Sequence, residues 1–228
     1  MLILALDTTG RVASAALCRD GRLTARCDRD SMMDHSRTIL PVCEQMLREQ
    51  GLTFADVDLF AATCGPGSYT GIRIGVAAVK GFAFGLDRPC VAVSTLESAA
   101  WADRAHQGRK LAAVRARPGE YFAALFEQSG EETLRLTDDG VWSEEEIRVL
   151  AEENGPLRLC GSGAAELLAA LGREEDAPGE VQSAASAALC AFDKTQRGQA
   201  IDGRDLTPSY LRPTQAERMK QQKEEKQL

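Results

Sequence analysis

The residues of this chain with the clearest chemical potential are a run of glycines. The segment Gly65-Pro66-Gly67-Ser68-Tyr69-Thr70-Gly71-Ile72-Arg73-Ile74-Gly75 follows the apolar run 57–64, a predicted buried strand, and opens a predicted helix that continues to about residue 84. A glycine-rich turn between a strand and a helix usually brings backbone N–H groups close to an anion. Here the glycine spacing is one residue too long for the dinucleotide pattern, and no Gly-Lys-Ser/Thr follows. The loop is therefore predicted not to be a nucleotide phosphate loop of either kind.

The chain offers few residues for a nucleophilic or metal centre. Ser162 lies between Gly161 and Gly163, which is not the G-x-S-x-G pattern of a nucleophilic serine, and no histidine is near it in sequence. The only histidines are His35 and His106, and no two cysteines form a C-x-x-C pair. A zinc or iron site needs several such ligands together. We therefore expect no catalytic residue and no metal site.

The helix after the loop carries interior glycines, and each costs about 1 kcal/mol relative to alanine. Gly71, Gly75, Ala78 and Phe82 fall on one face of this helix at helical spacing. Small side chains on a face allow another backbone to approach closely. Two interpretations remain open: the face packs against the sheet of its own domain, or it forms a helix–helix interface with another chain.

Composition and charge narrow the class of protein. Of the 228 residues, 44% are hydrophobic and 27% charged, with a formal net charge of −7. Nucleic-acid binding relies on cations that displace counterions from phosphate, so broad autonomous binding is not expected. The first residues lack the basic start and apolar length of a secretory signal, and no apolar run reaches the length of a membrane span. Seven cysteines without a disulfide pattern fit a reducing compartment, and we expect a cytoplasmic protein with no membrane partner.

Apolar runs and turn signals divide the chain into two similar α/β halves. Each half is predicted to open with a β-hairpin, around Asp20-Gly21 in the first and Pro118-Gly119 in the second, and to continue with strands and helices. The polar run 103–110 is predicted to be a boundary. The second half ends with an alanine-rich helix over 183–195. We predict subdomains over 1–102 and 103–213 and a polar tail over 214–228.

Local signals fix several details within these halves. Ser94 and Ser143 are each followed three residues later by glutamate, a capping box that predicts a helix start. Pro41 either occupies the first turn of a helix or kinks it, and the sequence does not decide between the two. The basic residues near the boundary are predicted to form a solvated linker rather than an RNA contact; they are Arg104, Arg109, Lys110, Arg115 and Arg117.

Four segments in this order resemble the TsaB (YeaZ) family. In chain order they are the opening Ile-Leu-Ala-Leu-Asp-Thr-Thr-Gly over 3–10, the pair His35-Ser36, the glycine motif 65–75, and the late Tyr210-Leu211-Arg212. The family contains a bacterial subunit of the machinery that makes N6-threonylcarbamoyladenosine in tRNA. The resemblance runs from the N-terminus to about residue 213. It implies that both halves have the actin/Hsp70/hexokinase-like (ASKHA) fold, with the second subdomain reduced.

The resemblance also implies roles for two short motifs. Actin-like ATPases carry an Asp-x-Gly-Thr/Ser phosphate loop where this chain has Asp7, Thr8 and Thr9; because Thr9 replaces the glycine, we expect a vestigial phosphate loop. His35 stands where the sister protein TsaD carries a His-x-x-x-His metal pair, but residue 39 is Ile39, so the second ligand is absent. A lone histidine before a helix is typically a cap or surface residue. We expect no cofactor on this chain, with ATP bound, if anywhere, at the level of a complex.

The function implied by the resemblance is that of a non-catalytic partner subunit that binds and supports the TsaD transferase. Expected partners are a TsaD homologue, a TsaE homologue through the complex, tRNA indirectly, and a second copy when the chain is alone. Two alternatives are an actin-like-fold metallopeptidase and a small-molecule kinase or ATPase. The partner surface is expected on two helices, at His35, Ser36, Ile39, Leu40, Cys43, Met46, Gly71, Ile72, Gly75, Ala78, Val79 and Phe82, next to the motif loop of Gly65, Pro66, Gly67, Ser68, Tyr69 and Thr70.

Overall fold

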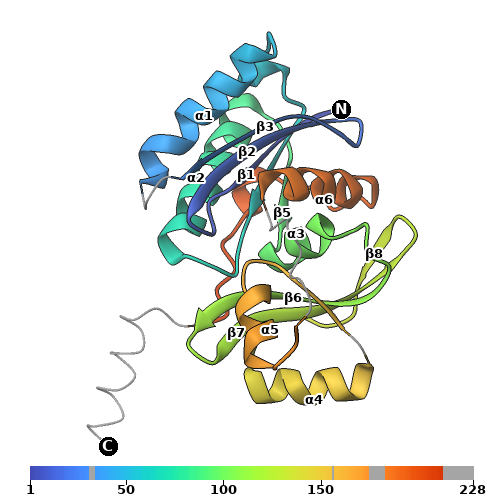
Figure 1. The fold of residues 1–228 in the computed structure, drawn as a ribbon. Coiled ribbons are helices and arrows are strands. Elements are labelled where there is room, and N and C mark those ends of the chain that lie inside the picture. Colours follow the sequence, from blue (N-terminus) through green and yellow to red (C-terminus); the bar gives the residue numbers. More distant parts are fainter. Residues whose placement is uncertain (31–33, 156, 175–182, 213–228) are drawn as a thin grey trace, which may run out of the picture.

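Two β-sheets, one in each half of the chain, organise the structure (Figure 1). The computed structural model describes residues 1–30, 34–155, 157–174 and 183–212. The first sheet has the order β3-β2-β1-β4-β5, and the second has the order β10-β6-β7-β8, with β9 paired to β7. The predicted tail over 214–228 lies outside the described residues.

The first sheet combines a β-meander with a parallel half. Its strands are β1 (Leu2–Asp7), β2 (Val12–Arg19), β3 (Arg22–Asp30), β4 (Leu59–Thr63) and β5 (Cys90–Val93). The first three strands are antiparallel neighbours, whereas β1, β4 and β5 run parallel. All six residues of β1 are buried, because helices cover both faces of the sheet and both sets of alternating side chains must then be apolar.

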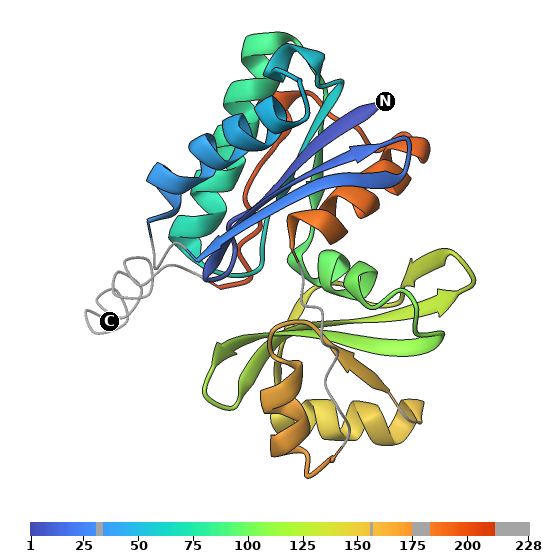
Figure 2. The same cartoon turned by 45° about the horizontal axis from the view of Figure 1, so that its top comes forward.

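Two helices cover one face of this sheet, α1 (His35–Glu49) and α2 (Tyr69–Leu86). Figure 2 shows them side by side, on the side of the sheet away from the second half. Pro41 is the seventh residue of α1 and therefore lies inside the helix rather than in its first turn. A short 3₁₀ turn, η1 (Phe54–Asp56), precedes β4.

The second sheet is built around the long hairpin of β6 (Gly108–Arg117) and β7 (Glu120–Ser129). The remaining strands are β8 (Glu132–Arg135), β9 (Gly140–Ser143) and β10 (Arg158–Cys160). The helices α4 (Glu144–Asn154) and α5 (Ala164–Ala170) pack on one face, and α3 (Thr95–Ala102) packs on the other. Both predicted capping boxes are present, at Ser94 and at Ser143.

The last helix corrects the predicted grouping of the chain. The helix α6 (Ala184–Gln196) packs on the second face of the first sheet, where its alanines meet Ile3 and Ala5 of β1, rather than on the second sheet. Its small side chains let it fit between that sheet and α3, with the hydroxyl oxygens of Ser98 and Ser186 2.8 Å apart. The division at residue 103 therefore does not follow the packing of α6, because order along the chain does not fix which sheet a helix covers.

The segment that was predicted to be a solvated basic linker is partly a strand in the structure. Residues 108–117 form β6, and Lys110 on this strand is fully buried. Its ammonium group donates to the carbonyl oxygens of Ala100 and Asp103 and to Oε1 of Gln128, at 3.1, 2.9 and 3.2 Å. Burial lowers the pKa of Lys110. The lysine thus joins the end of α3 to the second sheet instead of facing solvent.

Candidate functional site

The turn between β1 and β2 holds the predicted vestigial phosphate loop. Asp7 is 4% exposed, and its Oδ1 accepts hydrogen bonds from the backbone N–H and the hydroxyl of Thr9, at 2.8 and 2.7 Å. Its Oδ2 has no hydrogen-bond partner among the described residues. Burial raises the pKa of the Asp7 carboxyl, against the opposing effect of the Thr9 hydrogen bonds. The carboxyl is therefore folded back into its own turn, and burial favours its neutral form.

His35 supports the same turn from the start of α1. Its side chain is buried, with the residue 5% exposed, and Nε2 lies 2.9 Å from the carbonyl oxygen of Gly10. The expectation of a cap or surface histidine is therefore wrong. Nothing in its sequence neighbourhood signals the contact, because Gly10 lies 25 residues earlier in the chain and reaches His35 only in the folded protein.

The glycines at the start of α2 also pack on this turn. A Cβ atom at Gly71 would overlap the carbonyl oxygen of Thr8, and one at Gly75 would lie 2.5 Å from Thr8 Oγ1. The Thr8 hydroxyl donates to the carbonyl oxygen of Gly71 at 2.7 Å. For these two glycines, the interpretation of packing within the domain is the correct one.

The motif loop before α2 is shaped by the same contacts. Ser68 donates its backbone N–H to the carbonyl oxygen of Thr9 at 2.9 Å, and its hydroxyl accepts the N–H of Gly71 at 3.2 Å as the cap of α2. A Cβ at Gly67 would lie 2.7 Å from the Thr9 carbonyl oxygen. Gly65 has φ +113°, a conformation that favours glycine, and a Cβ there would overlap the carbonyl oxygen of Ser209. The glycines of the motif thus bring three chain segments close together.

Residues 199–212, here called the C-terminal strap, run along α2 toward the motif loop. The strap pairs with Cys90 through Ile201, and Lys80 of α2 donates to the carbonyl oxygens of Arg204 and Leu206 at 2.9 and 3.0 Å. The N–H of Ser209 donates to the carbonyl oxygen of Cys64 at 2.7 Å. These bonds fix the strap on the side of α2 away from α1.

The end of the strap joins the two halves of the molecule. The ring of Tyr210 stacks on Tyr69 with centroids 4.6 Å apart, and Arg73 Nε donates to the Tyr210 hydroxyl at 2.8 Å. The Tyr69 hydroxyl donates to the carbonyl oxygen of Arg212, whose guanidinium pairs with Glu120 of β7. Tyr210 and Arg212 therefore anchor the strap on the motif loop and on the second sheet.

The predicted partner surface on α1 and α2 is largely turned inward. Eight of its twelve residues are buried within this chain, so they do not form the exposed face that we expected: His35, Ile39, Cys43, Met46, Gly71, Ile72, Gly75 and Val79. Phe82 is half-buried and stacks on Phe54 at 4.5 Å, and Ala78 also packs against the core. Ser36 and Leu40 remain exposed. Helical spacing correctly grouped these residues on common faces, but it does not say which face meets the sheet.

The outward face of α2 carries a different set of residues, here called the α2 stripe: Ala77, Gly81 and Phe84. All three are exposed, and Phe84 is 77% exposed. A Cβ at Gly81 would meet nothing within 4 Å. On the neighbouring helix α1, Leu40 is 43% exposed and Pro41 is exposed as well. The spacing of the stripe was visible in the sequence, but its orientation was not.

Within the described ranges, no three His, Cys, Asp or Glu side chains come close enough to hold a metal ion. None of the helices described is long and apolar enough to cross a membrane. The two histidines stay separate, since His35 is buried under Gly10 and His106 is exposed after α3.

The two-sheet architecture, with the strand order β3-β2-β1-β4-β5 in the first sheet and helices on both faces of each sheet, is the actin-like (ASKHA) fold that was predicted. Residues 29–159 match the family model described as TsaD, tRNA N6-adenosine threonylcarbamoyltransferase. The solved structure of YeaZ from Pseudomonas aeruginosa aligns with a TM-score of 0.78 and 27% identity, over 92% of this chain and 99% of that one.

Two bacterial proteins named tRNA threonylcarbamoyladenosine biosynthesis protein TsaB are similar in sequence. The one from Bacillus subtilis is 29% identical over 223 residues, covering 95% of this chain and 96% of that protein. The one from Escherichia coli is 36% identical over 155 residues, covering 66% of this chain and 62% of that protein. The chain belongs to the TsaB (YeaZ) family, within the group that shares the TsaD-type domain. The predicted family and fold are confirmed, and neither alternative activity is favoured.

Proposed function

We propose that this chain is a non-catalytic partner subunit of the machinery that makes N6-threonylcarbamoyladenosine in tRNA, and that it binds and supports a TsaD homologue. Membership of the TsaB family supports this role, since two relatives are named tRNA threonylcarbamoyladenosine biosynthesis protein TsaB. We further propose that a TsaE homologue joins through the complex, that tRNA contacts are mainly indirect, that the isolated chain forms a homodimer, and that it acts in the cytoplasm.

The state of the β1–β2 turn supports a role without catalysis. In the structure Asp7 accepts two hydrogen bonds from Thr9, and His35 is engaged with the carbonyl oxygen of Gly10. Thr8 fills the space beside Gly71 and Gly75. Oδ1 of Asp7 is thus engaged within the turn itself, and the ring of His35 holds the turn from α1.

The observation that carries the proposal is the α2 stripe and its neighbours on α1. Ala77, Gly81 and Phe84 are exposed and uncharged, and the neighbouring helix α1 exposes Leu40 and Pro41. Exposed apolar groups on adjacent helices mark an interaction surface. The missing side chain at Gly81 allows a partner helix to approach the backbone of α2 closely. We therefore place the TsaD-binding surface on the outward faces of α1 and α2.

The test places a leucine on this surface and measures association. Ala77→Leu and Gly81→Leu would each place a bulky side chain between α2 and a partner helix. Overpacking of this kind costs about 1–3 kcal/mol, which raises the dissociation constant roughly tenfold to hundredfold. The matched control is Ala169→Leu, an exposed helical alanine on α5 in the second half. Binding to the TsaD homologue of the same organism is measured by calorimetry, and the melting temperature of each variant is recorded.

The expected result is weaker binding of both test variants, with binding of the control and all melting temperatures unchanged. Because both test positions are open in the isolated chain, a drop in melting temperature is not expected. Normal binding by Gly81→Leu, or equal weakening by Ala169→Leu, would contradict the location of the surface. Wild-type protein that fails to bind the TsaD homologue would contradict the proposed function itself.

A further inference from the structure

An exposed arginine and an exposed tyrosine meet near the start of α2. The Nε–H of Arg73 donates to the Tyr210 hydroxyl at 2.8 Å, and the guanidinium carbon lies 5.6 Å from the centre of the Tyr210 ring. Tyr210 remains 38% exposed although its ring stacks on that of Tyr69. Tyrosine and arginine are enriched among the residues that contribute most to binding in protein interfaces. The pair therefore has the composition of an interface anchor.

Arg73 lies on the same face of α2 as the α2 stripe. The residues of the stripe follow Arg73 after four, eight and eleven positions, which is the spacing of one helical face. Arg73 is exposed, as are all three residues of the stripe. At a rise of about 1.5 Å per residue, Arg73 lies about 12 Å from Gly81 along the helix axis. A partner helix that runs along the stripe therefore also reaches Arg73.

The C-terminal strap holds Tyr210 in place without a partner. Lys80 of α2 donates to two carbonyl oxygens of the strap at 2.9 and 3.0 Å, and the N–H of Ser209 donates to the carbonyl oxygen of Cys64 at 2.7 Å. The stacking on Tyr69, with ring centroids 4.6 Å apart, then orients the Tyr210 ring. Because the tyrosine is already ordered, a partner that contacts it loses little conformational entropy on binding.

The positive charge of Arg73 is not paired with a carboxylate in the part of the chain that the structure describes. Two other cations along the strap differ in this respect, since Arg204 pairs with Asp202 at 2.8 Å and Lys80 is bound to the strap carbonyl oxygens. The hydrogen bond to Tyr210 uses only the Nε–H of Arg73. The two terminal amino groups of the guanidinium can therefore bind a carboxylate from outside the chain.

We propose that the partner surface continues from the α2 stripe to Arg73 and Tyr210, and that the partner subunit places a carboxylate against the Arg73 guanidinium. This inference rests on the proposed function, and it adds a charged anchor to a surface that is otherwise uncharged along the stripe. The partner helix then carries an acidic residue about 12 Å from its closest approach to Gly81. The strap takes part in binding through Tyr210, which is 137 positions from Arg73 in the chain.

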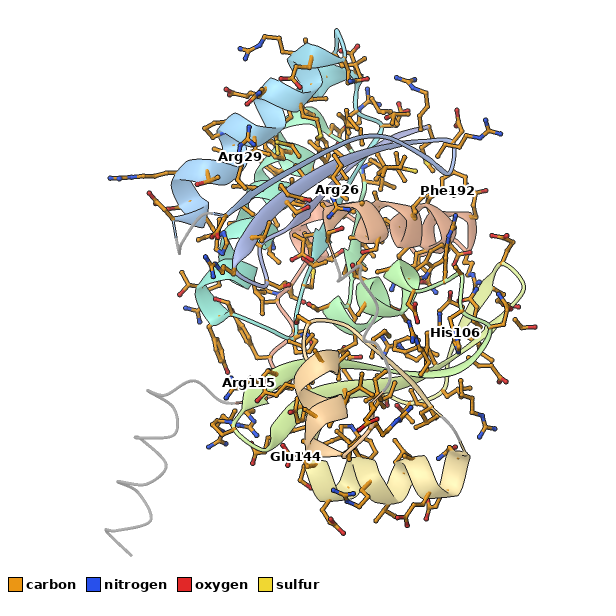
Figure 3. All side chains as sticks on the ribbon, in the orientation of Figure 1. Arg26, Arg29, His106, Arg115, Glu144 and Phe192 are labelled. Atoms are coloured by element: carbon orange, nitrogen blue, oxygen red, sulfur yellow. The ribbon has the colours of Figure 1, made fainter. Side chains whose placement is uncertain are left out.

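The experiment measures binding of the full chain to the TsaD homologue of the same organism by calorimetry, at low and at high salt. The test variants are Arg73→Gln, which removes the charge, and Tyr210→Phe, which keeps the ring and removes the hydroxyl that accepts from Arg73. The matched control is Arg26→Gln, which removes the same charge elsewhere in the first half. Figure 3 shows Arg26 on the side of the first sheet that α6 covers, where it pairs with Asp28 at 2.6 Å.

We expect Arg73→Gln to bind at least tenfold more weakly than the wild type, because the partner's carboxylate loses its opposite charge. Its dissociation constant should also increase less with added salt than that of the wild type, since salt screens the charge pair. Tyr210→Phe should bind about threefold to tenfold more weakly, with the salt dependence of the wild type, because the charge remains but is held less firmly. The control should bind as the wild type does, and all melting temperatures should be unchanged.

Normal binding by Arg73→Gln, with binding by Gly81→Leu still weakened, would overturn this inference and leave the proposed function in place. Equal weakening by Arg26→Gln, or weakening by Arg73→Gln without a change in salt dependence, would also overturn it. Loss of self-association in Arg73→Gln with normal binding of the TsaD homologue would assign the anchor to a second copy of the chain instead. Wild-type protein that does not bind the TsaD homologue would contradict the proposed function and this inference together.

Discussion

Gly75 and Gly81 lie six residues apart on the same helix, yet they meet different surroundings. A Cβ at Gly75 would lie 2.5 Å from Thr8 Oγ1, inside the chain, whereas a Cβ at Gly81 would meet nothing within 4 Å. Glycine weakens a helix interior at both positions by about 1 kcal/mol relative to alanine. At Gly75 this cost is offset by a close contact with the β1–β2 turn. At Gly81 no contact within the described part of the chain offsets it, which is the reason for assigning Gly81 to a partner.

This comparison shows that a small-residue helix can serve two surfaces at once. The inward glycines allow the backbone of α2 to approach the β1–β2 turn closely, and the Thr8 hydroxyl donates to the carbonyl oxygen of Gly71. At the outward Gly81 an added Cβ would meet nothing within 4 Å, and Phe84 is exposed on the same helix. The same residue type therefore has an internal packing role on one face and a proposed association role on the other.

The largest expected effect is at Gly71, where an added methyl group would overlap the backbone carbonyl oxygen of Thr8. We expect Gly71→Ala to destabilise the fold by about 3 kcal/mol, since a backbone atom cannot turn aside as a side chain can. For a chain of this size that is a fall in melting temperature of roughly 6–12 °C. Calorimetry or circular dichroism provides the measurement.

The matched control for this change is Gly81→Ala. Because its methyl group would point into open space, and alanine favours a helix over glycine by up to about 1 kcal/mol, we expect its melting temperature to stay the same or rise. If Gly71→Ala and Gly81→Ala have the same stability, the distinction between inward and outward glycines is wrong.

An intermediate effect is expected at Gly75, where the obstructing atom belongs to a side chain. Gly75→Ala alone should cost about 1–3 kcal/mol by overpacking against the Thr8 hydroxyl, and Thr8→Ala alone should cost about 1 kcal/mol through its lost hydrogen bond to Gly71. In the double variant the new methyl group occupies the space left by the hydroxyl. We expect a double-mutant cycle to show a favourable coupling of about 1–2 kcal/mol.

The same cycle with Gly71→Ala gives the contrast. Thr8→Ala leaves the backbone carbonyl oxygen in place, so it should not rescue Gly71→Ala. Rescue at both positions, or at neither, would show that the turn moves as a unit and that the contacts of the two glycines cannot be told apart.

The smallest effect concerns one proton in the turn that the inward glycines enclose. Burial raises the pKa of Asp7 above its ordinary value of 3.8, so the folded protein holds this proton to higher pH than the unfolded chain does. As pH rises from 3.8 toward the raised folded pKa, the unfolded chain loses its proton first, and the stability of the fold decreases across that window. Asp7→Asn keeps the acceptor for Thr9 and removes the titration.

We therefore expect the melting temperature of Asp7→Asn, relative to the wild type, to increase as the pH is raised from about 4 to 8, with little difference at the acid end. Parallel melting curves across this range provide the measurement. If the melting temperature of the wild type instead increased relative to that of Asp7→Asn as the pH rises, the fold would stabilise the ionised form of the Asp7 carboxyl.

Local signals predicted much of the fold because their physics is local. Both hairpins and both capping boxes depend on residues within a few positions of one another, and the structure contains all four. The apolar runs likewise predicted the central strands of both sheets. The errors concern contacts between distant segments, such as α6 on the first sheet, Lys110 under α3, and His35 against Gly10.

The candidate site divides in the same way. Helical spacing correctly grouped the residues of α1 and α2 into faces, but periodicity is unchanged when a helix is rotated about its axis. Which face meets the sheet depends on the total burial against β1, β2 and β4, and the sequence of α2 is apolar on more than one side. The α2 stripe was therefore identified only after the helix was seen in place.

The sequence by itself determined the family, the α/β class, the order of most strands and helices, though not β8 and β9, and the presence of a glycine loop that departs from known phosphate loops. Only the tertiary structure decided what that loop does: it brings the β1–β2 turn, the start of α2 and the C-terminal strap into contact, although Thr9, Ser68 and Ser209 are far apart in the chain. The physical reason is that backbone geometry and capping are set by neighbouring residues, whereas close approach of two backbones requires that both be positioned by the packed core.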